Sequence, residues 1–148
     1  MKAQSNLVRL TALSTLFYYV RWRICQSPDT FGAIPGFLRP TSVQLCVPHQ
    51  QWIDLIPWPA LRDFLILRLD GSQYAQFRDV LNDTFVMKWP QPISGCVVEG
   101  KGCYTLSLEF RRHLCNIDNW AMKPQALKEF PFLREVVNVL PEHYELDE

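Results

Sequence analysis

The hydrophobic positions of this chain recur mainly with the period of an α-helix. The clearest run lies near the N-terminus, where apolar side chains follow one another at spacings of three and four. This spacing puts one apolar stripe on one face of a helix from about residue 5 to residue 25. We expect that stripe to pack on the protein's own core; the alternative is a helix that binds a partner. Ser5 or Asn6 can cap its start. The stripe consists of Leu7, Leu10, Leu13, Phe17, Val20 and Ile24.

A loop and a short capped helix are expected next. Residues 26–40 hold three prolines and two glycines, which is typical of a loop. Thr41 and Gln44 then have the spacing of a capping box, in which each side chain bonds a backbone N–H of the other end. The short helix should end before Pro48, because the residue preceding a proline is disfavoured in the α region.

The most unusual stretch is residues 48–59, which we call the Trp/Pro segment. It contains two tryptophans, three prolines, a histidine and an aspartate. Pro57 and Pro59 end any helical turn by Ile56, and Pro59 suits the first position of a new helix. The segment is therefore expected to form a rigid corner between helices, with Trp52 and Trp58 as core anchors.

The rest of the chain alternates short apolar periods with breaks. The spacing after Pro59 predicts a helix, although the alternation of Leu65, Leu67 and Leu69 also suits a strand, and Gly71 and Ser72 can cap the helices around them. Apolar runs at residues 96–98 and 103–106 flank a glycine-containing turn and predict a β-hairpin. Further short helices are expected at 74–81, 107–114, 124–130 and 131–140. The expected fold is mainly α, a compact multi-helix single domain over residues 1–148, with a small hairpin near 96–106 and a loose acidic tail at 142–148.

Composition narrows the class of protein. Of 148 residues, 48% are hydrophobic and 13% aromatic, which is enough to build a core. The formal net charge is zero, so the basic excess of a domain that grips a phosphate backbone is missing, and no direct nucleic-acid contact is expected. The five cysteines are odd in number and irregular in spacing. They indicate reduced thiols of a nuclear or cytoplasmic protein.

A membrane role is not expected. The apolar run from Leu10 to Val20 is shorter than the roughly 20 residues that span a bilayer. Its length suits a signal peptide, but Arg21-Trp22-Arg23 follows where a small-residue cleavage site is required.

Metal and cofactor sites find weak support. Cys46 with His49, and His113 with Cys115, have ligand-like spacings, but a structural zinc site usually shows two clean ligand pairs. The residues around Lys101 lack the further glycine and the Ser or Thr of a phosphate-binding loop. We expect neither metal nor cofactor.

Acid–base chemistry has two candidate pairs, His49 with Asp54 and Asp63 with Arg62. His49 lies among aromatic residues, where its pKa can shift and it can face a pocket. The alternative is that His49 and Asp54 bond backbone groups left without partners at the two-proline turn. Nothing else completes a catalytic set, so an enzyme is not expected.

A longer stretch, residues 39–63, carries a family resemblance. It reads Arg-Pro-Thr-Ser-Val-Gln-Leu, then Val-Pro-His-Gln-Gln-Trp-Ile-Asp-Leu-Ile-Pro-Trp-Pro, then Leu-Arg-Asp. This resembles the signature of a fungal domain of unknown function that commonly lies C-terminal to the basic-leucine-zipper region of transcription-factor-like proteins. The hairpin, the Ser107 helix start and Trp120 are similar too. Gln50 and Gln51 depart from the family's paired His and Pro, and Tyr104 and His113 lie where a second Trp is usual.

The resemblance implies a nuclear, non-enzymatic accessory, regulatory or protein-interaction domain with a protein partner. The chain starts directly with the N-terminal helix, so DNA contacts are not implied for these residues. A second hypothesis is a small-molecule sensor whose pocket is lined by Trp52, Trp58, His49 and Asp54. The candidate binding or structural motif comprises His49, Trp52, Asp54, Pro57, Trp58, Pro59, Arg62 and Asp63.

Overall fold

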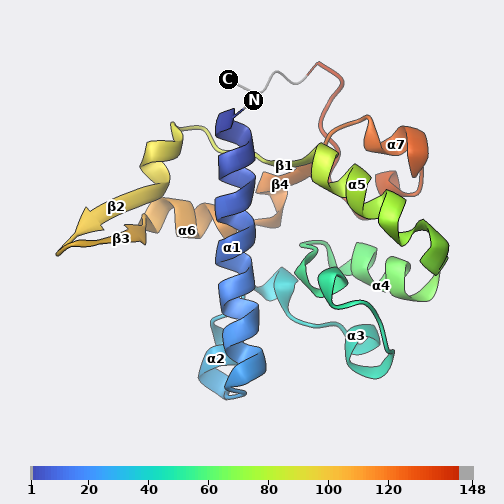
Figure 1. Ribbon diagram of the computed structural model, residues 1–148, viewed down its shortest axis with the longest axis horizontal. Coiled ribbons are helices and arrows are strands. Elements are labelled where there is room, and N and C mark those ends of the chain that lie inside the picture. The colour runs from blue at the N-terminus through green and yellow to red at the C-terminus, as the bar shows by residue number, and fades with distance from the viewer. Residues whose placement is uncertain (1, 144–148) are drawn as a thin grey trace.

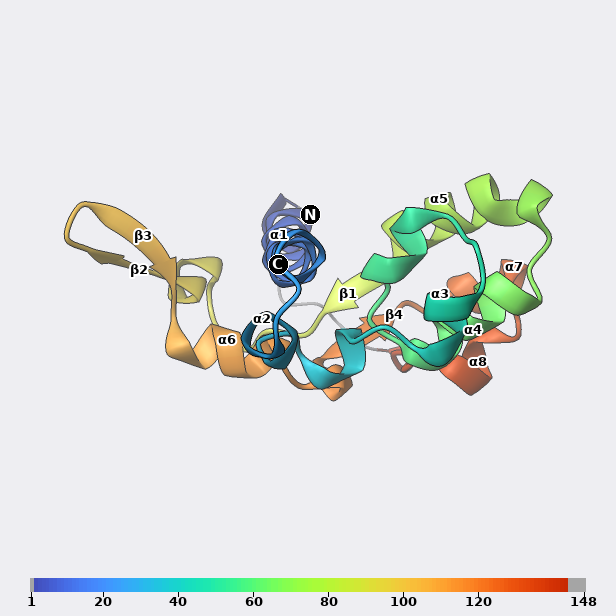
Figure 2. The ribbon, with the colours of Figure 1, turned by 90° about the horizontal axis from the view of Figure 1, so that it is seen from below.

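The computed structural model describes residues 2–143, with side chains from residue 6 onward. A long helix, α1 (Lys2–Ile24), crosses the middle of the molecule, with the β2–β3 hairpin on one side of it and α3, α4, α5 and α7 on the other (Figure 1). Figure 2, which looks along α1, shows the same division. The expected mainly α single domain with a small hairpin is confirmed. Residues 144–148 of the expected acidic tail lie outside the described part.

The expected orientation of α1 is wrong. Leu7 is buried, but the remainder of the buried face is formed by Thr11, Ser14, Thr15 and Tyr19. The apolar stripe is turned outward, with Leu13 64% and Phe17 58% exposed. The small size of these hydroxyl-bearing side chains lets α1 lie close to its neighbours. The hydroxyls of Ser14 and Thr15 donate hydrogen bonds to backbone carbonyls of their own helix. The helix also begins before Ser5 and Asn6, so neither residue is its N-cap.

The expected loop at residues 26–40 contains structure. Ser27 caps a short helix, α2 (Pro28–Gly32), and a 3₁₀ turn, η1 (Gly36–Leu38), follows. Both are single turns, too short for a periodic apolar pattern to reveal. Next comes α3 (Ser42–Cys46), where the expected capping box is confirmed, since Gln44 N–H donates to Thr41 Oγ1 and Thr41 N–H donates to Gln44 Oε1.

The Trp/Pro segment forms the expected corner. A 3₁₀ turn, η2 (Gln51–Leu55), ends at Ile56, and α4 (Pro59–Leu67) begins with Pro59 at its first turn. The strand alternative for residues 65–69 is therefore wrong. After α4, Asp70 rather than Ser72 is the cap: its carboxylate accepts from Ser72 N–H at the start of η3 (Gly71–Gln73).

A second two-stranded sheet was not expected from the sequence. Strand β1 (Phe85–Met87) continues directly from α5 (Tyr74–Thr84) and pairs antiparallel with β4 (Trp120–Met122). Helix α1 contacts β1. This sheet therefore joins α1 to the C-terminal part of the domain.

The predicted hairpin is confirmed as β2 (Val97–Gly100) and β3 (Cys103–Leu106), preceded by η4 (Ile93–Cys96). The elements that follow the hairpin are short. Each of the three helices expected there, at 107–114, 124–130 and 131–140, corresponds to a shorter helix in the structure. These elements are α6 (Leu108–Leu114), capped by Ser107, then η5 (Ile117–Asn119), α7 (Ala126–Glu129) and α8 (Leu133–Val136).

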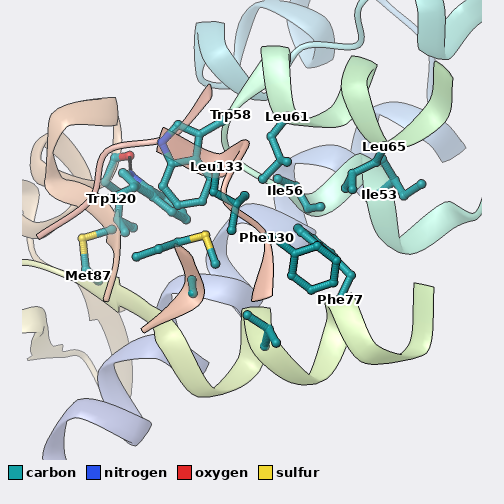
Figure 3. Packing of buried hydrophobic residues seen from close by; sticks show 14 of the residues in the cluster. Ile53, Ile56, Trp58, Leu61, Leu65, Phe77, Met87, Trp120, Phe130 and Leu133 are labelled. Carbon is teal, nitrogen blue, oxygen red and sulfur yellow. Dashed lines mark hydrogen bonds between the residues drawn. The ribbon is translucent and has the colours of Figure 1, made fainter. Parts of the chain in front are cut away.

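The core is rich in aromatic rings. Phe85 packs edge-on against both Trp58 and Trp120. Phe77 packs against Phe130 (Figure 3). Trp58 is almost fully buried and Trp52 is half-buried against Phe77, so the expected anchoring by both tryptophans is seen. The Trp/Pro segment thereby fastens α4 and α5 to the β1–β4 sheet.

Candidate functional site

The polar centre of the domain is the carboxylate of Asp54, which is buried at the corner of the Trp/Pro segment. Its Oδ1 accepts hydrogen bonds from Gln44 Nε2 at 2.6 Å and from His49 Nε2 at 2.8 Å. Its Oδ2 accepts from the Tyr19 hydroxyl at 2.6 Å, and Arg23 lies 4.0 Å away. One carboxylate therefore joins α1, α3 and η2.

Arg62 is the second member of this network and is completely buried. Its Nε donates to Gln44 Oε1 at 2.7 Å, and its terminal nitrogens donate to the carbonyls of Ile56, Pro57, Phe37 and Arg39. A guanidinium has five N–H groups, so every one has an acceptor. Burial lowers the pKa of Arg62 to about 10, which leaves the side chain charged at neutral pH. Arg62 thus ties the turn before α3 to the Trp/Pro segment.

Gln44 connects the two charged residues. Its Nε2 donates to Asp54, while its Oε1 accepts from both Arg62 Nε and Thr41 N–H. The neighbouring residue of the motif, Asp63, accepts from the Thr41 hydroxyl at 2.5 Å. The capping box of α3 is therefore also the bridge between Asp54 and Arg62.

Both ring nitrogens of His49 have a partner inside the domain. Nδ1 faces the Val47 carbonyl at 2.7 Å and Nε2 faces Asp54, and both partners accept hydrogen bonds. Burial lowers the pKa of His49, but the bonds to Val47 and Asp54 outweigh it, and the pKa is raised above its ordinary value. When His49 is protonated, its imidazolium and the Asp54 carboxylate form a mostly buried ion pair.

The same contacts act on Asp54 and Tyr19. Burial raises the pKa of Asp54, but hydrogen bonds from Tyr19, His49 and Gln44 outweigh it, so the net pKa is lowered. Burial and the bond to the Asp54 carboxylate raise the pKa of Tyr19 to about 12. Near neutral pH the network therefore holds a carboxylate, a guanidinium and a neutral phenol, and the raised pKa of His49 favours its imidazolium form.

The predicted motif residues fall into two groups. His49, Asp54, Arg62 and Asp63 belong to the polar network, with Asp63 attached through Thr41. Trp52, Pro57, Trp58 and Pro59 instead form the corner and its packing. The pairing of His49 with Asp54 is as expected, but it bonds side chain to side chain, and only His49 also takes up a backbone carbonyl.

Sequence reasoning missed Tyr19 and Gln44 as network members. The capping-box pattern predicts only the capping role of Gln44, although its capping and bridging contacts use the same side chain. Tyr19 lies 35 residues from Asp54 in sequence, and no local signal connects them. A polar residue on the supposed back of the α1 stripe was the available hint.

Ligand-like cysteine and histidine pairs do not come together. Both ring nitrogens of His49 are taken by Val47 and Asp54, so the ring cannot also bind a metal beside Cys46. His113 Nε2 bonds the Lys88 carbonyl. Residues 2–143 contain no group of three or more His, Cys, Asp or Glu side chains placed to hold a metal ion. All five cysteines are free thiols, with only Cys96 buried.

Two hollows lie beside this network, along one flank of α1. One, of about 310 Å³, is bordered by Tyr19, Arg23, Trp52 and Asp54. The other, of about 260 Å³, is mostly apolar and is bordered by residues such as Leu13 and Phe85. His49 and Trp58 border neither hollow. No helix in the described part of the chain is long and apolar enough to cross a membrane.

The fold and site define a small, mainly helical domain whose corner is held by a buried Asp–His–Gln–Arg network. The chain belongs to the family described as a domain of unknown function, DUF3425, whose match covers residues 17–140. No curated protein and no solved structure gives a significant match. The family match includes the whole network, from Tyr19 to Asp63.

Proposed function

We propose that this chain is a non-enzymatic accessory, regulatory or protein-interaction domain of a fungal transcription-factor-like protein of the basic-leucine-zipper type. The resemblance of residues 39–63 to a domain that commonly follows a basic-zipper region supports this class and a nuclear or cytoplasmic location. On this proposal the domain acts by contacting another protein, while DNA binding belongs to a different segment.

The observation that carries the proposal is the outward face of α1. Leu13, Phe17, Val20 and Ile24 form an apolar strip in which the exposed fraction runs from 39% to 82%. A contiguous exposed apolar surface is typical of interaction sites, whereas single exposed apolar residues need no explanation. The hydroxyl-rich face of α1 packs on the core, and this apolar strip remains exposed, where a partner can contact it.

The state of the titratable groups agrees with a non-enzymatic role. His49 has both nitrogens bonded inside the domain, and the five donors of Arg62 are all used. A general base needs a free lone pair within reach of a substrate proton. The strongest acid–base candidates of the sequence therefore act as structural groups in this proposal.

A tethering experiment tests the proposed function. The full chain is fused to an unrelated DNA-binding domain and directed to a reporter promoter in a fungal host. The expected result is a reproducible change in reporter output. The matched control is Arg62→Ala, which removes the buried guanidinium and should abolish the effect through loss of the fold. An unchanged output from a soluble, correctly localised fusion would contradict the regulatory role.

A second candidate, a small-molecule sensor, is favoured by the hollow of about 310 Å³ next to Asp54. Trp52 and Asp54 of the predicted pocket border it, whereas Trp58 is in the core. Thermal-shift screening of small carboxylic acids and aromatic compounds tests this idea. A ligand at 100 times its Kd should stabilise the domain by about 2.7 kcal/mol, and Arg23→Gln should weaken carboxylates selectively. Absence of any shift across the screen would leave the interaction role alone.

A further inference from the structure

The two hollows beside α1 adjoin each other, and we call them together the groove. Leu16 of α1 and Leu55 of the Trp/Pro segment border both. The α1 wall extends from Val8 to Arg23, which corresponds to about 22 Å at 1.5 Å per residue. The opposite wall comes from η2, Ile56 and Pro57, and from the end of α5. A groove of this length fits about four turns of a helix.

The groove changes character along its length. Near Val8 its walls are apolar, with Leu81 and Phe85 opposite α1. Near Arg23 polar residues, Gln51 and Asp54 among them, join the apolar ones. Arg23 and Asp54 are the charged residues among the lining residues of both hollows, and the Asp54 carboxylate is already saturated with donors. The half-exposed guanidinium of Arg23 lies over the Tyr19 ring and donates from Nη1 to the Tyr19 hydroxyl. The same nitrogen lies 4.0 Å from Asp54.

The exposed strip of α1 adjoins this groove. Leu13 and Val20 belong both to the strip and to the groove wall, so the two surfaces meet along one edge of the helix. A ligand seated in the groove would therefore also cover the nearer half of the strip. The combined surface offers buried positions for apolar anchors one helical turn apart, the pattern by which an amphipathic helix binds a groove.

Charge identifies the kind of helix that fits. Helix α1 contains Arg9, Arg21 and Arg23 and no acidic residue, although the whole chain is neutral. Of these three cations, Arg23 lines the groove. Pairing α1 with α1 of a second copy would bring these cations together, which disfavours a homodimer through this face. A helix with acidic residues flanking its apolar anchors meets complementary charge instead.

We propose that the groove between α1 and the Trp/Pro segment binds an acidic amphipathic helix of a partner protein. The inference rests on the proposed interaction role and names its docking surface and the chemistry of the partner. A lipid surface fits less well, because a flat bilayer reaches the outer strip but not the concave wall formed by Leu55 and Phe85. The helix would place apolar side chains at i, i+4 and i+7 in the groove and a carboxylate at Arg23.

A charge-randomised peptide library tests this directly. The probe is a displayed set of 18-residue helix-forming peptides with Leu fixed at i, i+4 and i+7 and the other positions drawn from Glu, Lys, Gln and Ala. Selection on the full chain should enrich Glu over Lys. The enriched peptide, made synthetically, should bind more weakly as salt is raised.

Matched variants locate the binding surface. Leu13→Glu with Val20→Glu should weaken the selected peptide by about tenfold or more. Leu108→Glu is the control, because Leu108 is 62% exposed, like Leu13 at 64%, but lies on α6. Circular dichroism checks that all variants are folded. Arg23→Gln should remove most of the preference for Glu.

The outcomes are distinct. Enrichment of Lys, no enrichment, or equal loss in the Leu108→Glu control overturns the docking proposal. So does a dimer that the Leu13→Glu, Val20→Glu variant dissociates, or binding of anionic phosphatidylserine vesicles in place of the peptide. If the tethered reporter responds but is unaffected by the double variant, the regulatory role stands and only the docking surface is wrong. If the library enriches Glu but the tethered chain does not change reporter output, the docking surface stands and the regulatory role is wrong.

Discussion

The Nε of Arg62 donates a 2.7 Å hydrogen bond to Oε1 of Gln44, and this contact joins the start of α4 to the capped helix α3. Through Gln44 it also connects the two oppositely charged residues of the motif, Arg62 and Asp54. The characteristic residues of the Trp/Pro segment are therefore best understood as parts of one buried structural network, and its energetics can be measured.

Replacing Arg62 should be the most damaging single change in this network. Arg62→Ala removes the donor from the carbonyls of Ile56, Pro57, Phe37 and Arg39 and one of the two donors from Gln44 Oε1. We therefore expect a loss of roughly 3–5 kcal/mol in unfolding free energy. Arg62→Lys cannot reproduce the fork of five donors and should rescue little. Urea denaturation measures both. The control is exposed Arg68→Ala, expected within about 0.5 kcal/mol of wild type; an equal effect there would refute the assignment.

The pair formed by His49 and Asp54 predicts how stability depends on pH. The folded pKa of His49 is raised, so its stabilisation is complete below about pH 6.5 and is lost as pH rises through the folded value. The folded pKa of Asp54 is lowered, so its stabilisation is present above about pH 3.8 and is lost as pH falls through the folded value.

Unfolding free energy measured from pH 5 to pH 9 checks the alkaline side. It should decline above pH 6.5 with a slope of at most about 1.4 kcal/mol per pH unit, the limit for one proton. His49→Gln should flatten this decline, whereas His143→Gln, at an exposed position, should keep it. A decline that survives in His49→Gln would show that another group is responsible.

The bond between Tyr19 and Asp54 should be energetically coupled. Tyr19→Phe removes a hydrogen bond to a buried carboxylate, which should cost roughly 1.5–3 kcal/mol. A double-mutant cycle with Asp54→Asn should give a coupling energy of about 1 kcal/mol or more. The same cycle with Tyr104→Phe, a tyrosine 72% exposed on the hairpin, should give none. Simple additivity in the Tyr19 cycle would mean that the contact adds nothing.

Thr11 offers a stabilising change. Its side chain is completely buried against the core, and its Oγ1 has no hydrogen-bond partner among the described residues. Thr11→Val keeps the shape and removes the unpaired hydroxyl, so stability should rise by about 1 kcal/mol. Thr105→Val on exposed β3 is the control and should have little effect. Thermal unfolding is the measurement, and a lower midpoint for Thr11→Val would contradict the hydroxyl-face packing of α1.

Several features could be predicted because they depend on nearby residues. The capping box of Thr41 and Gln44 acts over three residues, and Pro59 limits its own dihedral angle and that of Trp58. The β2–β3 turn has positive φ at Lys101 and Gly102, and Gly102 adopts this conformation without steric cost. The mainly α class and the motif residues followed from such local rules and from the resemblance.

The sequence by itself determined that α1 is a helix with one apolar and one hydroxyl-rich face, and that the Trp/Pro segment turns the chain. Only the tertiary structure decided that the hydroxyl-rich face is buried, that β1 pairs with β4, and that Tyr19 reaches Asp54. Periodicity fixes which side chains share a face, because it follows from helix geometry. Which face meets the core depends on partners far away in sequence, whose packing no local pattern specifies.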